Sequence, residues 1–100
     1  MEPNKLEPSK EFLAEFCRKY SVRELSLFGS AARGDLNDRS DIDILVEFEP
    51  GAKTGIMKFT RMQRELAEVF GRKVDLVSKK GLNPVIREEV IESATTLYAA

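Results

Sequence analysis

The sequence predicts an α/β fold of the α+β type, in which helices cover a small three-stranded sheet. Segments with apolar residues at helical spacing alternate along the chain with shorter apolar or alternating segments that are typical of strands. The 100 residues include 42% hydrophobic and 33% charged residues, a composition typical of a globular domain and unlike that of a disordered chain. We therefore expect one domain over residues 1–100, although strand order and direction do not follow from the sequence.

The N-terminal half predicts one helix followed by two strands. Ser9 can cap a helix that ends near Tyr20. The apolar residues of this helix fall on one face: Phe12, Leu13, Phe16, Cys17 and Tyr20. Residues 25–28 form a short apolar run that Gly29 ends, and in residues 41–48 every second side chain is apolar, which places Ile42, Ile44, Val46 and Phe48 on one face. Both segments are predicted strands, and a short helical turn is expected between them.

The C-terminal half predicts helix, strand and helix. Thr54 is expected to cap a longer helix that Gly71 ends, residues 74–78 form the third strand, and residues 79–81 form a turn. A final helix is predicted from about Pro84, with four apolar residues on one side: Ile86, Val90, Ala94 and Leu97. This segment is more apolar than one narrow stripe requires. Core packing and a partner surface both remain open as explanations.

Two residue counts exclude several kinds of chemistry. The chain has no histidine, so a Ser-His-Asp triad and a histidine-based metal site are excluded, and any metal must be bound by oxygen atoms. The single cysteine, Cys17, cannot form an internal disulfide and is predicted to be a small packed apolar residue. The chain has no apolar run near 18 residues and no segment resembling a signal peptide, so we expect a cytoplasmic protein.

Charge is unevenly distributed along the chain. The net charge is −1, so no global electrostatic field would draw the protein to nucleic acid or to a membrane. Residues 1–50 contain seven basic and eleven acidic residues, whereas residues 51–100 contain nine basic and six acidic ones. This imbalance indicates a local acidic cluster in the first half.

Three aspartates form the acidic cluster that the pattern predicts. If Ile42 and Ile44 are buried, Asp41 and Asp43 must share the opposite face of their strand, with Cα atoms about 6.6 Å apart. Asp75 lies within an apolar strand, where a lone carboxylate is costly unless it is paired or bound to a metal. Two aspartates on the solvated face of a strand are common, so this pattern alone is a weak signal.

A glycine-serine turn strengthens the interpretation of the three aspartates as a metal site. Gly29 and Ser30 follow the first predicted strand, where glycine permits close approach of a ligand and free backbone N–H groups suit a phosphate. Gly29-Ser30, ten residues, and then Asp41-Ile42-Asp43 resemble the signature of the DNA polymerase beta-like nucleotidyltransferase superfamily. Residues 28–34, 40–46 and 71–77 are similar to the minimal nucleotidyltransferases of prokaryotes, and Asp75 stands where that family has its third carboxylate.

The resemblance implies a small mixed sheet, a nucleotidyltransferase fold and a set of site residues. Asp41, Asp43 and Asp75 would be catalytic residues that hold two Mg²⁺ ions, with Asp75 also a candidate base, and ATP would be the substrate. Gly29 and Ser30 would hold the β- and γ-phosphates. Three further residues are candidates for phosphate contacts: Arg33, Arg39 and Ser40.

The resemblance also implies a partner. The resemblance implies that this protein is the antitoxin of a HEPN-domain ribonuclease toxin. Active members of the family transfer AMP from ATP to a tyrosine of the toxin. We therefore expect a hetero-oligomer with such a toxin, and no direct binding to nucleic acid or membrane. Two alternatives remain open: an antitoxin that neutralises its toxin by masking it, and a nucleotidyltransferase that modifies a small molecule on its own.

Overall fold

The computed structural model describes residues 8–29 and 41–99. Three helices and four strands are present in these residues, together with a short 3-10 turn at Lys79–Gly81. The helices are α1 (Lys10–Lys19), α3 (Ile56–Phe70) and α4 (Pro84–Ser93). The strands are β1 (Val22–Phe28), β2 (Ile42–Phe48), β3 (Val74–Ser78) and β4 (Thr95–Ala99). The α+β class is therefore confirmed, with one strand more than the sequence predicted.

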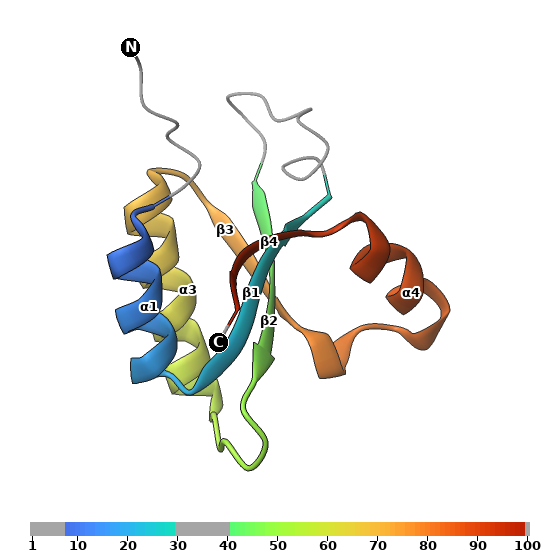
Figure 1. The fold of residues 1–100 in the computed structure, drawn as a ribbon, viewed down its shortest axis with the longest axis horizontal. Helices are drawn as coiled ribbons and strands as arrows, with labels where there is room; N and C mark the ends of the chain where they lie inside the picture. Colours follow the sequence, from blue (N-terminus) through green and yellow to red (C-terminus); the bar gives the residue numbers. More distant parts are fainter. Residues whose placement is uncertain (1–7, 30–40, 100) are drawn as a thin grey trace.

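The four strands form one mixed sheet in the order β3-β2-β1-β4. β1 pairs antiparallel with both β2 and β4, and β2 pairs parallel with β3. Parallel neighbours need a long connection, and α3 provides it between β2 and β3. α1 and α3 lie side by side on one face of the sheet, whereas α4 lies on the other side (Figure 1).

The apolar face of the sheet packs against α1 and α3. Ile42 and Ile44 of β2 are fully buried, as the alternation predicted, and Leu25 of β1 is buried beside them. Met62 and Leu66 on α3 are also completely buried in the same core. Apolar burial of this kind is the main term that holds a small domain together.

The first helix begins and ends as the sequence predicted. The Ser9 side chain accepts a hydrogen bond from the Phe12 backbone N–H at 3.1 Å, which caps α1. Leu13, Phe16 and Cys17 are buried on its inner face. Burial raises the pKa of the Cys17 thiol to about 12, so this cysteine remains a neutral packing residue.

The start of α3 differs from the prediction, whereas its end agrees. Gly55, and not Thr54, is the N-cap residue, and no side chain caps the helix. The Thr54 hydroxyl oxygen is instead buried with no hydrogen-bond partner in the described structure. At the other end, Gly71 adopts a left-handed conformation (φ 73°) and its N–H donates to the Ala67 carbonyl at 2.9 Å.

The final helix is shorter than predicted. α4 begins at Pro84 after the Asn83 cap, but it ends at Ser93, so Ala94 and Leu97 are not helical. Residues 95–99 instead pair with the edge of β1, where Tyr98 lies opposite Leu25. The prediction of a continuous helix was wrong because this β-branched and aromatic segment gains backbone hydrogen bonds from an edge that the sequence does not reveal.

No helix in the described part of the chain is both long enough and apolar enough to cross a membrane.

Candidate functional site

The strand register brings residues of the glycine-aspartate motif to one end of the sheet. Asp43 lies opposite Phe28 on β1 and opposite Asp75 on β3. Neighbouring strands are about 4.8 Å apart, so the backbones of the two aspartates are adjacent. Gly29 directly follows Phe28, which places the glycine turn at the same end.

The aspartates occupy the face of the sheet opposite the core. Ile42 and its partner Val74 are buried, whereas Asp43 is half-buried and Asp75 is exposed. Asp41 is exposed immediately before β2, two residues from Asp43. The alternation of β2 therefore directs both aspartates away from the apolar core.

Electrostatic repulsion links the three carboxylates. The pKa of Asp43 is raised above its ordinary value, first by burial and then by the negative charges of Asp75 and Asp41. A carboxylate that is both desolvated and close to like charges gains most from a nearby cation. Asp43 is thus the electrostatic centre of this cluster.

Gly29 fits tightly against Asp43. Its φ of +69° lies in the left-handed region, which side chains other than that of glycine rarely adopt. A Cβ atom at this position would lie 2.5 Å from the Asp43 carboxylate oxygen Oδ2, too close for any real contact. The turn therefore requires glycine for its conformation and for the space beside Asp43.

The donor set suits a magnesium ion. Mg²⁺ prefers oxygen ligands and is commonly held by one or two carboxylates, with water and substrate phosphates completing its shell. Within residues 8–29 and 41–99, no three acidic or cysteine side chains lie close enough together to enclose a metal ion. At this end of the sheet, Asp43, a neighbouring aspartate and a bound triphosphate could together supply the oxygen ligands of the ion.

Four of the predicted site residues lie outside the described residues: Ser30, Arg33, Arg39 and Ser40. The predicted helical turn after Gly29 falls in the same segment. Their contacts with phosphate therefore stay predictions.

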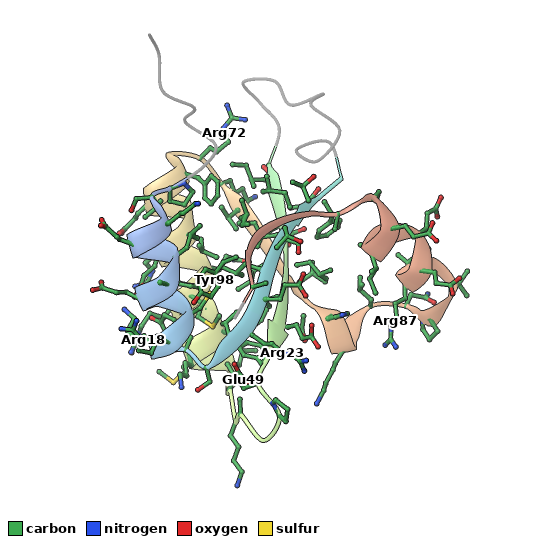
Figure 2. The ribbon with its side chains drawn as sticks, in the orientation of Figure 1. Arg18, Arg23, Glu49, Arg72, Arg87 and Tyr98 are labelled. Carbon is green, nitrogen blue, oxygen red and sulfur yellow. The ribbon has the colours of Figure 1, made fainter. Side chains whose placement is uncertain are left out.

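Two residues at this end of the sheet were not singled out from the sequence. Phe28 is the register partner of Asp43 and shares its face, a position that depends on the antiparallel pairing of β1 and β2. Arg72 precedes β3, and its side chain lies near the end of the sheet where β2 begins (Figure 2). A basic residue shortly before the strand that carries Asp75 was the available signal for Arg72.

Comparison with known proteins agrees with this geometry. The model of the nucleotidyltransferase domain family matches residues 9–97. Protein adenylyltransferase MntA of Thermococcus cleftensis is 38% identical over 77 residues, which cover 77% of this chain and 76% of the relative. A solved structure provisionally described as a minimal nucleotidyltransferase is 36% identical and has a TM-score of 0.71, with 84% of both chains covered.

Two solved toxin-antitoxin complexes share the fold at lower identity. One, crystallised with AMP-PNP, has a TM-score of 0.73 at 23% identity and covers 90% of this chain and 73% of its own. The other contains an MNT antitoxin with a tri-AMPylated HEPN toxin of Shewanella oneidensis. Its TM-score is 0.64 at 21% identity, with 90% of this chain and 69% of the other covered. Because the family model spans almost the whole chain, this protein belongs to the nucleotidyltransferase domain family, in which its relatives include a protein adenylyltransferase.

Proposed function

We propose that this protein is a Mg²⁺-dependent protein adenylyltransferase that transfers AMP from ATP to a hydroxyl group of a HEPN ribonuclease toxin. The observation that carries the proposal is the position of Asp43, which lies between Gly29 and Asp75 at one end of the sheet. The name of the Thermococcus relative and the AMPylated toxin in a structurally similar complex support the choice of reaction and partner.

The aspartates would have separate roles in this reaction. Asp41 and Asp43 would hold the metal, and Asp75 would be the base for the incoming hydroxyl. Because the three carboxylates do not enclose an ion in the described structure, Asp75 would become a further ligand only when a bound ion draws them together. Bound Mg²⁺ would supply charge neutralisation for the triphosphate. Gly29 and Ser30 would hold the β- and γ-phosphates through backbone N–H groups and the serine hydroxyl. Candidates for additional phosphate contacts remain Arg33, Arg39 and Ser40.

The chemistry requires in-line attack on the α-phosphorus of ATP. The acceptor oxygen forms a new bond to the α-phosphorus. The bond between the α-phosphorus and the oxygen that bridges the α- and β-phosphates breaks, and pyrophosphate leaves. The acceptor proton passes to a base, for which Asp75 is the candidate. We propose a toxin tyrosine as acceptor, because a phenol can reach an open sheet face from a partner surface.

A masking antitoxin is the second candidate function. Three apolar residues on α4 are exposed: Val85 at 86%, Ile86 at 43% and Ile91 at 37%. A surface of this kind suits a stable protein complex, which could silence a toxin without chemistry. The same surface would also position a toxin for AMP transfer, so only an assay of the reaction separates the two functions.

Intact mass spectrometry of the HEPN partner tests the proposal. The partner would be incubated with this protein, ATP and Mg²⁺, and we expect its mass to rise by whole AMP units on a tyrosine that fragmentation identifies. Asp43→Asn should abolish the increase. Glu47→Gln is the matched control, since Glu47 lies on the same face of β2 but four residues further along. No mass increase, combined with a stable complex that silences the toxin, would favour masking.

A further inference from the structure

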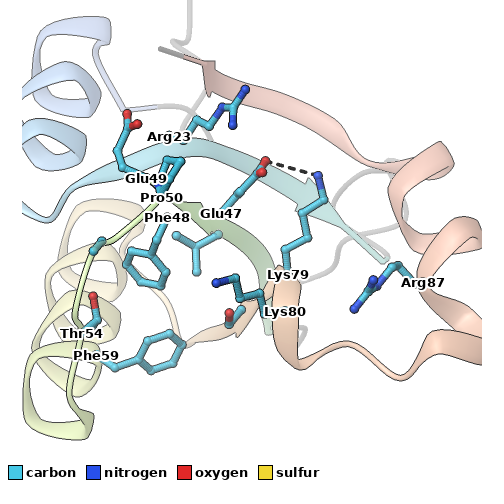
Figure 3. Close-up of a pocket in the computed structure, with 13 residues that line it drawn as sticks. Arg23, Glu47, Phe48, Glu49, Pro50, Thr54, Phe59, Lys79, Lys80 and Arg87 are labelled. Atoms are coloured by element: carbon cyan, nitrogen blue, oxygen red, sulfur yellow. Dashed lines mark hydrogen bonds and ion pairs between the residues drawn. The ribbon is translucent and has the colours of Figure 1, made fainter.

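A cavity of about 500 Å³ lies at the end of the sheet opposite the aspartates (Figure 3). It is lined by the last residues of β2 and by residues that follow β3, and none of Gly29, Asp41, Asp43 or Asp75 lines it. The five residue steps from Asp43 to Phe48 span about 16 Å along the strand. The cavity is therefore separate from the carboxylate site.

The inner wall of the cavity is apolar and partly aromatic. The rings of Phe48 and Phe59 lie with their centroids 6.5 Å apart and their planes inclined by 52°. Val46, Pro50 and Ala52 complete this wall. A volume of several hundred cubic ångströms with such a lining is typical of sites for small organic molecules.

Basic side chains surround the apolar wall. Arg23, Lys79, Lys80 and Arg87 line the cavity, against two acidic residues, Glu47 and Glu49. This local excess of positive charge contrasts with the net charge of −1 for the whole chain. Arg23 and Glu49 lie close to each other at this end of the sheet, whereas Arg87 comes from α4 (Figures 2 and 3).

Three of the four basic side chains form no ion pair within the described part of the protein. Lys79 forms an ion pair with Glu47 at 3.2 Å. Arg23, Lys80 and Arg87 have no ion pair or side-chain hydrogen bond with any described residue. Unpaired cations beside an apolar wall provide a charged group and a hydrophobic surface for the same ligand.

We propose that this cavity is a second ligand site, which binds a small organic anion. The apolar or aromatic body of the ligand would contact Phe48 and Phe59, and its anionic group would interact with Lys80 and Arg87. A carboxylate, phosphate or sulfonate would each satisfy these cations. A nucleic acid backbone is a poorer fit, because Glu47 and Glu49 would repel a long polyanion.

Two fluorescent probes of the same shape test this site. The probes are 8-anilino-1-naphthalenesulfonate, which is an anion, and N-phenyl-1-naphthylamine, which lacks the sulfonate. We expect the anion to bind the full chain at one saturable site and about tenfold more tightly than the neutral probe. In a ¹⁵N-labelled sample, its amide shift changes should fall in residues 46–54 and 78–87.

Charge variants decide the outcome. The double variant Lys80→Gln, Arg87→Gln should weaken binding of the anionic probe about tenfold and leave the neutral probe unchanged. The matched control is Lys10→Gln with Arg64→Gln, which removes the same charge from exposed positions on α1 and α3 outside the cavity. Equal binding of both probes, equal effects of the two double variants, or shift changes confined to other surfaces would each overturn the proposal.

Discussion

Gly29 and Gly51 both have left-handed backbone angles, but their surroundings differ. Gly29 has a φ of +69° and lies against Asp43, whereas Gly51 has a φ of +84°, and a Cβ atom added there would meet nothing within 4 Å. Alanine at either position incurs the same kind of backbone strain, about 1–2 kcal/mol. Only at position 29 would the methyl group also displace a carboxylate of the candidate site.

Gly29→Ala should therefore impair both stability and function, whereas Gly51→Ala should impair stability alone. We expect Gly51→Ala to lower the free energy of unfolding by about 1–2 kcal/mol and to retain AMP transfer. Gly29→Ala should be less stable still and lose about 100-fold in transfer rate, because a displaced metal ligand disturbs the reacting geometry. Urea unfolding and the transfer assay measure the two effects. Equal losses of activity in both variants would refute a specific role for Gly29.

Thr54 and Ser9 look alike in the sequence but differ in the structure. Ser9 accepts a hydrogen bond from Phe12, whereas the Thr54 hydroxyl has no partner in the described structure. We expect Thr54→Val to raise the free energy of unfolding by about 1 kcal/mol, because it removes an unsatisfied buried hydroxyl at constant shape. Ser9→Ala, the matched comparison, should lower it by about 1 kcal/mol. A loss of stability in Thr54→Val would contradict this expectation and would mean that the hydroxyl is hydrogen-bonded in solution, for example to water in the cavity that Thr54 lines.

At the scale of elements, one acidic residue joins the two helices on the apolar face. Glu65 of α3 accepts a hydrogen bond from the Tyr20 hydroxyl at 2.7 Å and is paired with Lys19 at 3.2 Å. Burial raises the pKa of Glu65, but the hydrogen bonds from Tyr20 and Lys19 outweigh it, so the net pKa is lowered. The ionised form of Glu65 therefore stabilises the contact between α3 and the end of α1.

This contact should make stability depend on pH. Because the pKa of Glu65 is lower in the folded protein than in the unfolded chain, its contribution is complete above the unfolded value, about 4.3, and is lost as pH falls through the folded value. Glu65→Gln should be less stable at pH 7 and should lose less stability than the wild type on acidification. Glu68→Gln, an exposed change on the same helix, is the control. Parallel pH profiles for wild type and Glu65→Gln would contradict this assignment.

Local signals in the sequence were sufficient for some elements and insufficient for others. The cap at Ser9 and the stop at Gly71 each depend on neighbouring residues, and each was predicted correctly. The alternation of β2 was correct for Ile42, Asp43 and Ile44 but fails at Leu45, which is buried on the face that carries Asp43. Residues 95–99 fit both helical and strand spacing, so only the free edge of β1 decides that they form β4. The elements that depend on distant partners were the ones that the sequence could not specify.

The candidate site could likewise be predicted only in part from the sequence. Alternation alone placed Asp43 on the polar face, and the motif indicated Asp75. Their adjacency depends on the parallel pairing of β2 with β3, which the sequence did not determine. The basic cavity was not predicted at all, because Arg23, Lys80 and Arg87 are far apart in sequence and form no motif.

At the scale of the whole molecule, the two ends of the sheet have opposite chemical character. Asp43 and Asp75 lie at one end, whereas basic side chains surround a cavity at the other. The exposed apolar residues of α4 lie on the sheet side away from α1 and α3 (Figure 1). A partner protein docked on that side would have access to the polar face of β2, which carries Asp43.

The most direct test of nucleotidyl transfer follows the fate of each ATP phosphate. ATP labelled with ³²P at the α- or the γ-position would be incubated with this protein, Mg²⁺ and the proposed HEPN partner. Attack at the α-phosphorus predicts that the α-label appears on the partner and the γ-label in pyrophosphate, and that Asp43→Asn abolishes both. Transfer of the γ-label to the partner, or α-label transfer that survives Asp43→Asn, would contradict the account.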